Sequence, residues 1–312
     1  MYKRQGTIKL LTNGLTESSQ VSITKTVTLD LGSAKVLNLK DPINVTGSNI
    51  TFTVNSTGTA GSLKSSAQTV RNTGKGTVII KSAKLSTTST TLPAISNEGG
   101  GTLKLSGTTI TSDYYIISNT SGSTIIESGT YDGGIVNRST MTISGGTITN
   151  KSLEISTILS REGSTLNITG GKIYSQNSSG DLRTTIKLYN TNKDYSESPC
   201  KATISGGTIY SSNEEASTIQ NYYSDLTITG GTIEHKAKFM AVNNQGGHTR
   251  MNSPGGTVIS NVGGTSLAVV VSQDGGAFAV NKGTIKNTGG GYCYKNADTG
   301  TIVRGTNGVY SK

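Results

Sequence analysis

The sequence predicts an all-β fold: a single-stranded, right-handed parallel β-helix (β-solenoid) of about ten coils. Three observations predict it. An eight-residue phrase containing a Gly-Gly pair recurs along the chain, and a second series of short apolar stretches ending in Asn runs out of phase with it. Within each phrase, apolar and polar residues alternate. Self-similarity at a period of about 20 to 50 residues is typical of solenoids.

The composition of the 312 residues counts against other fold classes. Charged residues make up 15% of the chain, hydrophobic residues 32%, and there is no Trp. A helical bundle would be rich in Ala, Leu, Glu and Lys, whereas this chain is rich in Thr and Gly. There is no run of about 18 apolar residues, so we expect no membrane-spanning helix. Ile, Val and Thr recur too regularly for a disordered chain.

The eight-residue phrase predicts two strands and the turn between them. Its alternation is that of a strand with one buried face, and the Gly-Gly pair then turns the chain because Gly adopts positive φ at no steric cost. A second short strand begins at the following Thr-Ile, and a third ends at the Asn of the other series. The first Gly of the pair recurs after 25, 36, 24 and 25 residues. The clearest copies are Met141–Ile148, Leu166–Ile173, Ala202–Ile209 and Leu226–Ile233.

The second series predicts a ladder of side-chain amides. Asn residues at the same turn of successive coils can stack and hydrogen-bond to one another along the solenoid. We expect this ladder at Asn72, Asn97, Asn119, Asn137, Asn190, Asn221 and Asn243.

We expect residues 21–300 to form the β-helix, residues 1–20 to be an N-terminal segment without an assigned structure, and residues 301–312 to be an irregular coil or cap. The first five residues equal the translation of a common transposase adaptor read from a GTG start codon. Residues 1–5 are therefore interpreted as an artefact of a fragmentary metagenomic contig. On that interpretation the lack of a secretion signal says nothing about the compartment.

The eight-residue phrases, together with the opening Lys25–Leu31, resemble right-handed parallel β-helix proteins of the pectate-lyase-like superfamily. In particular, they resemble the surface and adhesin-type repeat proteins of gut Firmicutes, over residues 21 to 300 or so. This resemblance implies an extracellular or cell-surface location. It is specific for fold alone, since the superfamily holds lyases, glycosidases, phage tailspikes and adhesins.

The tyrosines indicate where a ligand could bind. Six of the 13 tyrosines fall between residues 174 and 223, and Tyr174 and Tyr210 each follow the last Ile of a phrase, which places them outward on adjacent coils. The longest coil adds a loop near residues 191–200. Aromatic side chains beside polar loops commonly hold sugars. The expected glycan-binding residues are Tyr174, Tyr195, Tyr210, Tyr222 and Tyr223.

Residues for catalysis or metal binding are scarce. Glycoside hydrolysis uses two carboxylates about 5 to 9.5 Å apart. The best cluster is Glu214 and Glu215 with Glu234 and Asp225, for which solvated turn carboxylates are the competing interpretation. His235 and His248 lack a third ligand, so we expect no metal site and no cofactor. Cys200 and Cys293 should be free thiols.

The leading hypothesis is a non-catalytic extracellular module, a structural stalk or adhesin that binds cell-surface or host glycans. Anionic glycans are included because residues 1–100 carry 11 Lys and Arg against 4 Asp and Glu. We expect no nucleic-acid partner, since the charge is dilute and no such motif occurs. A phage tail fibre or tailspike segment, located on the virion and homotrimeric, is one alternative. A polysaccharide lyase or glycoside hydrolase is the other.

Overall fold

A computed structural model of the chain describes residues 6–151, 155–176, 183–264 and 266–311. Every regular element in these ranges is a β-strand, and the chain divides into unit 1 (residues 1–147) and unit 2 (residues 148–312). Each unit is a parallel β-solenoid, with about 12 turns in all. This confirms the predicted all-β parallel solenoid, and the expected ten coils are close to the number found.

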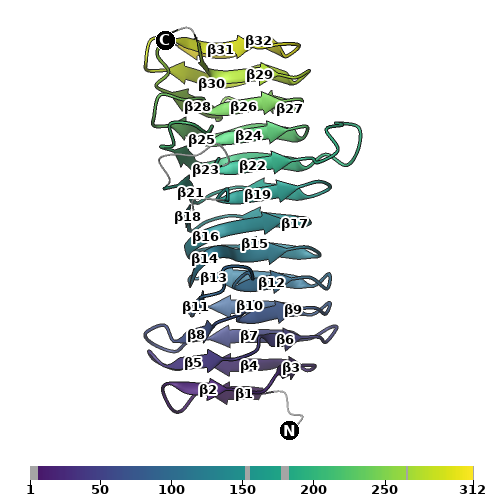
Figure 1. Ribbon diagram of the computed structural model, residues 1–312, viewed down its shortest axis with the longest axis vertical. Helices are drawn as coiled ribbons and strands as arrows, with labels where there is room; N and C mark the ends of the chain where they lie inside the picture. The colour runs from purple at the N-terminus through teal and green to yellow at the C-terminus, as the bar shows by residue number, and fades with distance from the viewer. Residues whose placement is uncertain (1–5, 152–154, 177–182, 265, 312) are drawn as a thin grey trace. The chain divides into compact units, whose positions relative to one another are not determined.

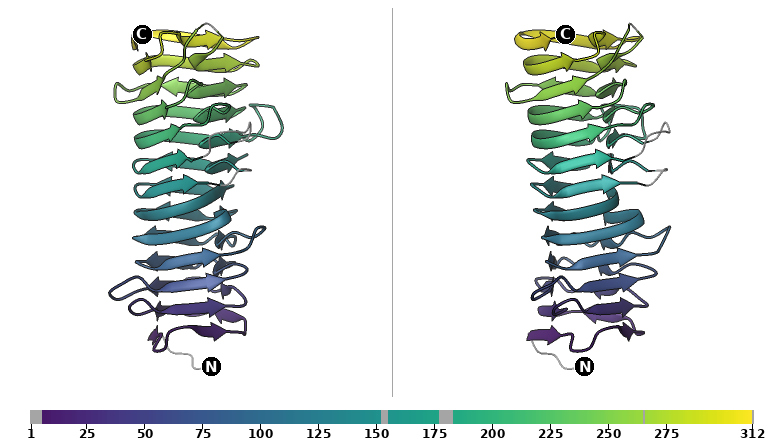
Figure 2. Two further views of the ribbon diagram at one scale, coloured as in Figure 1. Left: turned by 60° about the vertical axis from the view of Figure 1, so that its left-hand side comes forward. Right: turned by 90° about the vertical axis from the view of Figure 1, so that its left-hand side faces the viewer.

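In unit 1 the parallel strands form three stacks, in which the strands of successive coils lie one above another (Figures 1 and 2). Stack A consists of β1 (Gly6–Lys9), β4 (Val27–Asp30), β7 (Thr51–Asn55), β10 (Thr77–Lys81), β13 (Thr102–Ser106), β15 (Ser123–Ile126) and β17 (Thr140–Ile143). Stack B consists of β2 (Leu15–Glu17), β5 (Val36–Leu39), β8 (Ser62–Ser65), β11 (Lys84–Thr87) and the first parts of β14 (Thr108–Asn119) and β16 (Gly129–Asn137). Stack C consists of β3 (Val21–Ile23), β6 (Ile43–Val45), β9 (Val70–Asn72), β12 (Ile95–Asn97) and the second parts of β14 and β16.

Unit 2 also has three stacks, and β18 (Thr147–Asn150) crosses the boundary into it. Stack D consists of β20 (Thr165–Ile168), β27 (His248–Met251) and the first parts of β23 (Lys201–Ser211), β25 (Asp225–His235), β30 (Ala277–Asn287) and β32 (Thr301–Ser311). Stack E consists of β21 (Lys172–Ser175), β28 (Thr257–Ser260) and the second parts of β23, β25, β30 and β32. Stack F consists of β19 (Ile158–Arg161), β22 (Ile186–Tyr189), β24 (Ile219–Tyr222), β26 (Val242–Gln245), β29 (Ala268–Gln273) and β31 (Tyr292–Asn296).

Regular strands extend into both segments that flank the expected β-helix. At the N-terminal side, β1 begins at Gly6 and pairs with β4. At the C-terminal side, β32 covers Thr301–Ser311 and pairs with β30 along most of its length. Residues 1–5, interpreted from the sequence as an artefact, lie outside the described residues.

The core consists of inward columns of apolar side chains. The strand register aligns one residue of each coil with its equivalent on the next, and every member of the two columns below is at most 1% exposed. Burying a side chain of this size stabilises the fold by about 1.5–3 kcal/mol relative to leaving it in water. Thus each coil of this polar chain contributes to the core. The columns are Val54, Ile80, Leu105, Ile126 and Ile143 in unit 1, and Ile168, Ile204, Ile228, Met251 and Val280 in unit 2.

Candidate functional site

A column of buried asparagines runs through stack C of unit 1. The register aligns Asn72, Asn97, Asn119 and Asn137 on successive coils, and each is at most 1% exposed. The Nδ2 of each amide donates to the Oδ1 of the next, at 2.9, 3.1 and 2.9 Å in order along the chain. The four side chains form one continuous ladder, and such networks strengthen when every member is satisfied.

In stack F of unit 2 the equivalent position is filled differently. The Nδ2 of Asn221 donates to Oδ1 of Asn244 at 2.9 Å, and the Nδ2 of Asn244 donates to Oγ of Ser272 at 3.1 Å. Asn244, rather than the expected Asn243, therefore occupies the ladder position. The reason is the alternation of β26, in which Asn244 is fully buried and Asn243 lies on the outward side.

Asn190 also differs from its expected place in the ladder. The register pairs Leu188, not Asn190, with Asn221. Asn190 is buried at the start of the long loop between β22 and β23, which projects from the coil in Figure 1. Its Nδ2 donates to the main-chain oxygens of Asp194 and Glu197, both at 2.8 Å. Asn190 therefore orders the loop, and Leu188 occupies the position of β22 that is aligned with Asn221.

The same loop carries Tyr195, whose contacts join it to stack D. The hydroxyl of Tyr195 donates to the Asp225 carboxylate, and its ring centroid lies 3.7 Å from that of His248. Nη1 of Arg250 lies 3.4 Å from Oδ1 of Asp225. Burial, followed by the interaction with Asp225, raises the pKa of Tyr195 to about 12. At neutral pH the phenol is thus a proton donor that fastens the loop.

Tyr174 and Tyr210 stack on each other in stack E, as expected from their places in the repeat. Their ring centroids are 4.7 Å apart and the planes differ by 5°. Nζ of Lys236, from the following coil, lies 3.8 Å from the Tyr210 centroid, and Nζ of Lys172 lies 5.2 and 5.4 Å from the two centroids. Both faces of the Tyr210 ring are therefore covered, which leaves the ring edges to meet a ligand.

Tyr189 and Tyr222 form a second stacked pair, in stack F. Their centroids are 5.2 Å apart at 22°, and Tyr223 meets Tyr222 edge-on at 4.8 Å. The register places Arg161 one coil before Tyr189, and its Cζ lies 5.6 Å from that ring. Nζ of Lys187, two residues earlier on β22, lies 4.8 Å from the same ring. Tyr189 is therefore held between a cation of the preceding coil and a ring of the following coil.

The expected glycan-binding tyrosines divide into three separate groups. Tyr174 and Tyr210 belong to stack E, Tyr189 and Tyr222 to stack F, and Tyr195 packs on stack D. The three stacks are different sides of each coil. Closeness in sequence therefore does not place these rings on one surface.

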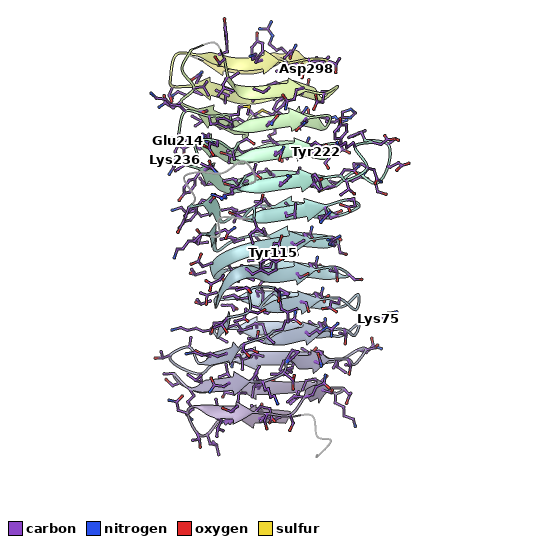
Figure 3. The ribbon with its side chains drawn as sticks, in the orientation of Figure 1. Lys75, Tyr115, Glu214, Tyr222, Lys236 and Asp298 are labelled. Atoms are coloured by element: carbon purple, nitrogen blue, oxygen red, sulfur yellow. The ribbon has the colours of Figure 1, made fainter. Side chains whose placement is uncertain are left out.

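The candidate catalytic acids also lie apart from the tyrosines of stack F. Glu214 and Glu215 are exposed in the turn between β23 and β24, where the main-chain N of Glu215 donates to Oδ1 of Asn213 at 2.9 Å. Glu234 lies outward on β25, aligned with Tyr210. Figure 3 shows Tyr222 over the strands facing the viewer and Glu214 at the left-hand edge. Among the described residues, no three His, Cys, Asp or Glu side chains are placed to hold a metal ion.

His235 is a buried titratable group in unit 2. It is 1% exposed, and its Nδ1 lies 3.1 Å from Oγ1 of Thr218. Its Nε2 is buried and has no hydrogen-bond partner among the described residues. Burial, which disfavours the charged imidazolium, lowers the pKa of His235 to about 4 from its ordinary value of 6.5. The ring is therefore neutral in the folded chain at neutral pH.

This predicts a loss of stability in mild acid. Between pH 6.5 and 4 the unfolded chain binds a proton at His235 that the folded chain does not, so the free energy of unfolding falls as the pH falls. The full loss is about 3 kcal/mol below pH 4. Urea unfolding at a series of pH values should show this slope in the parent chain and a flatter profile in His235→Asn. Equal slopes in the two proteins would contradict the assignment to His235.

The outward side chains of β19, β22, β24 and β26 form a surface that we call the polar face. Its residues alternate with buried ones along each strand, and none of them is acidic. Nε2 of Gln220 donates to Oε1 of Gln245 at 3.4 Å, and Nε2 of Gln245 donates to Oδ2 of Asp274 at 2.6 Å. The polar face consists of Leu159, Arg161, Lys187, Tyr189, Gln220, Tyr222, Asn243 and Gln245.

The two cationic residues and the two glutamines of this face were not identified from the sequence: Arg161, Lys187, Gln220 and Gln245. The four lie in different sequence surroundings, and only the register brings them to one side of successive coils. Aligning each strand on its buried Ile or Val, at Ile158, Ile186, Ile219 and Val242, would have found them.

Comparisons with protein-family models, with curated proteins and with solved structures find no match to this chain. None of the described residues forms a helix long and apolar enough to cross a membrane.

Proposed function

We propose that this chain is a non-catalytic extracellular β-helix module, a structural stalk of the adhesin type whose polar face binds glycan. The observation that carries the proposal is the polar face itself. Tyr222, Gln220 and Gln245 present phenol and amide groups on neighbouring strands. Such groups both donate and accept hydrogen bonds, as a hydroxyl-rich sugar requires.

The scaffold beneath the polar face supports this proposal. Strands β22, β24 and β26 pair in register, so their side chains repeat at the strand spacing of about 4.8 Å. The hydrogen bond between the amides of Asn221 and Asn244 joins β24 and β26 on their inner side. Binding groups held on a rigid element lose little conformational freedom when a ligand binds. A repeating row of this kind suits an extended polymer.

A glycan and polysaccharide array, probed with the labelled protein at low and physiological salt, tests the proposal. We expect binding to a discrete set of glycans that persists at physiological salt. Gln220→Ala should weaken it about 2- to 10-fold, since a net hydrogen bond is lost. Thr227→Ala, an outward change on β25 in stack D, is the matched control and should bind normally. Absence of binding, or binding abolished by salt, would contradict the proposal.

A further inference from the structure

Two cations flank one ring of the polar face. Arg161 and Lys187 approach Tyr189 from the preceding coil and from the same strand, at 5.6 Å (Cζ) and 4.8 Å (Nζ) from its centroid. The second face of Tyr189 is covered by Tyr222. The two positive groups therefore lie at one end of the row that Gln220 and Gln245 continue.

Neither cation is fully neutralised within the described part of the chain. Nε of Arg161 lies 3.4 Å from Oε2 of Glu162, a long contact to its sequence neighbour, while Oε1 of Glu162 accepts from Thr191 at 3.3 Å. For Lys187 the described residues provide no carboxylate partner and no hydrogen-bond acceptor. Its three N–H donors and the terminal N–H groups of Arg161 are thus available to a ligand.

The surroundings of Lys187 disfavour its charged form. Burial, and then the charge of Arg161, lowers the pKa of Lys187, so the fold holds a half-buried ammonium beside a second cation. The cation–π contact of Nζ with the Tyr189 ring offsets part of this cost, but a ring face accepts no conventional hydrogen bond from the ammonium. Groups whose charged form is disfavoured in this way cluster at functional sites.

We propose that Arg161 and Lys187 hold the acid group of an acidic sugar, a uronate carboxylate or a sugar sulfate, bound along the polar face. Arg presents a planar fork that matches the paired oxygens of such groups, and Lys adds a point charge. The next units of the glycan then meet Tyr222, Gln220 and Gln245. This assignment rests on the function proposed above and names its ligand class.

The test measures affinity by isothermal titration calorimetry for two matched pairs of oligosaccharides. One pair is a glucuronate-containing oligosaccharide and its methyl ester, and the other is a sulfated oligosaccharide and its desulfated parent. We expect the parent protein to prefer one acidic member by about 10-fold or more. Lys187→Gln should remove that preference. It should not lower the thermal midpoint of unfolding, because it removes the like-charge contact with Arg161. Lys172→Gln is the matched control, with a lysine beside a stacked tyrosine pair in stack E.

Each outcome decides between explanations. Equal affinity for acidic and neutral members, with Lys187→Gln unaffected, would overturn the acidic-sugar assignment and leave the glycan-binding proposal standing. Loss of preference in Lys172→Gln rather than Lys187→Gln would overturn it by moving the site to stack E. An oligonucleotide that binds as tightly as the acidic glycan would show general polyanion attraction and also overturn it. If no oligosaccharide binds, both proposals fail.

Discussion

Asn119→Asp is expected to destabilise unit 1 by about 3 kcal/mol, although the two side chains have the same shape. In the parent chain Nδ2 of Asn119 donates to Oδ1 of Asn137 and to the main-chain oxygen of Thr140, both at 2.9 Å. Aspartate puts an acceptor oxygen where that donor was, facing two other acceptors in a site with no exposure to water. The substitution thus converts two hydrogen bonds into repulsions and buries a charge.

Urea unfolding of the two proteins at neutral pH measures the effect. The matched control is Asn49→Asp, which makes the same change at an exposed position of the same unit and should stay within about 0.5 kcal/mol of the parent. Similar losses in the two variants would mean that overall charge, rather than the ladder, sets the stability. A loss restricted to Asn119→Asp would show that donor direction is what the column requires.

The direction of the ladder also explains where it begins. Each amide donates toward the C-terminus, so the first amide of a column has an Oδ1 with no donor behind it. The Oδ1 atoms of Asn72 and Asn221 are buried and lack partners among the described residues. The residues aligned before them are Val45 and Leu188, which have no polar side chain. One unsatisfied oxygen at the start of each ladder is the cost of changing from an apolar to a polar column.

Much of this fold could be predicted from the sequence because its determinants are local. The alternation of apolar and polar residues in Leu226–Ile228 indicates which side chains face inward. The equivalent apolar residues are buried in the other clear copies of the phrase. The Asn column from Asn72 to Asn137 could also be expected, because each Asn there follows the inward Ile or Val by two residues. In that part of the chain the two-residue spacing between the inward Ile or Val and the Asn is enough to give the register between coils.

The candidate site could not be predicted in the same way because it depends on register between coils. Aligning Asn190 with Asn221 fails because β22 begins at Ile186, two residues earlier than that alignment requires. Arg161 and Lys187 are 26 residues apart in the sequence, with two other strands between them. Only the register between coils brings both side chains to Tyr189. No local pattern marks either residue. Side chains gathered from separate coils become visible once the strands are paired.

Gly230→Ala is the other substitution with a large expected effect, and it separates two roles of the Gly-Gly pair. A Cβ built on Gly230 would overlap the main-chain oxygen of Ser205 on the preceding coil. Main-chain atoms held by paired strands cannot move aside without breaking their hydrogen bonds, so we expect a loss of about 3 kcal/mol or more. Gly255 holds the same place in the next repeat, but its nearest neighbour would be the Thr229 oxygen at 3.4 Å, an ordinary contact.

Gly255→Ala is therefore the control, expected to cost about 1 kcal/mol or less, with thermal or urea unfolding of both variants as the measurement. Neither Gly230 nor Gly255 has positive φ, whereas Gly231, the second of its pair, has φ of +77°. The second glycine is thus explained by the turn, and the first by the close approach of two coils. Equal unfolding midpoints for the two variants would mean that coil spacing at this corner relaxes freely, leaving the first glycine without a structural reason.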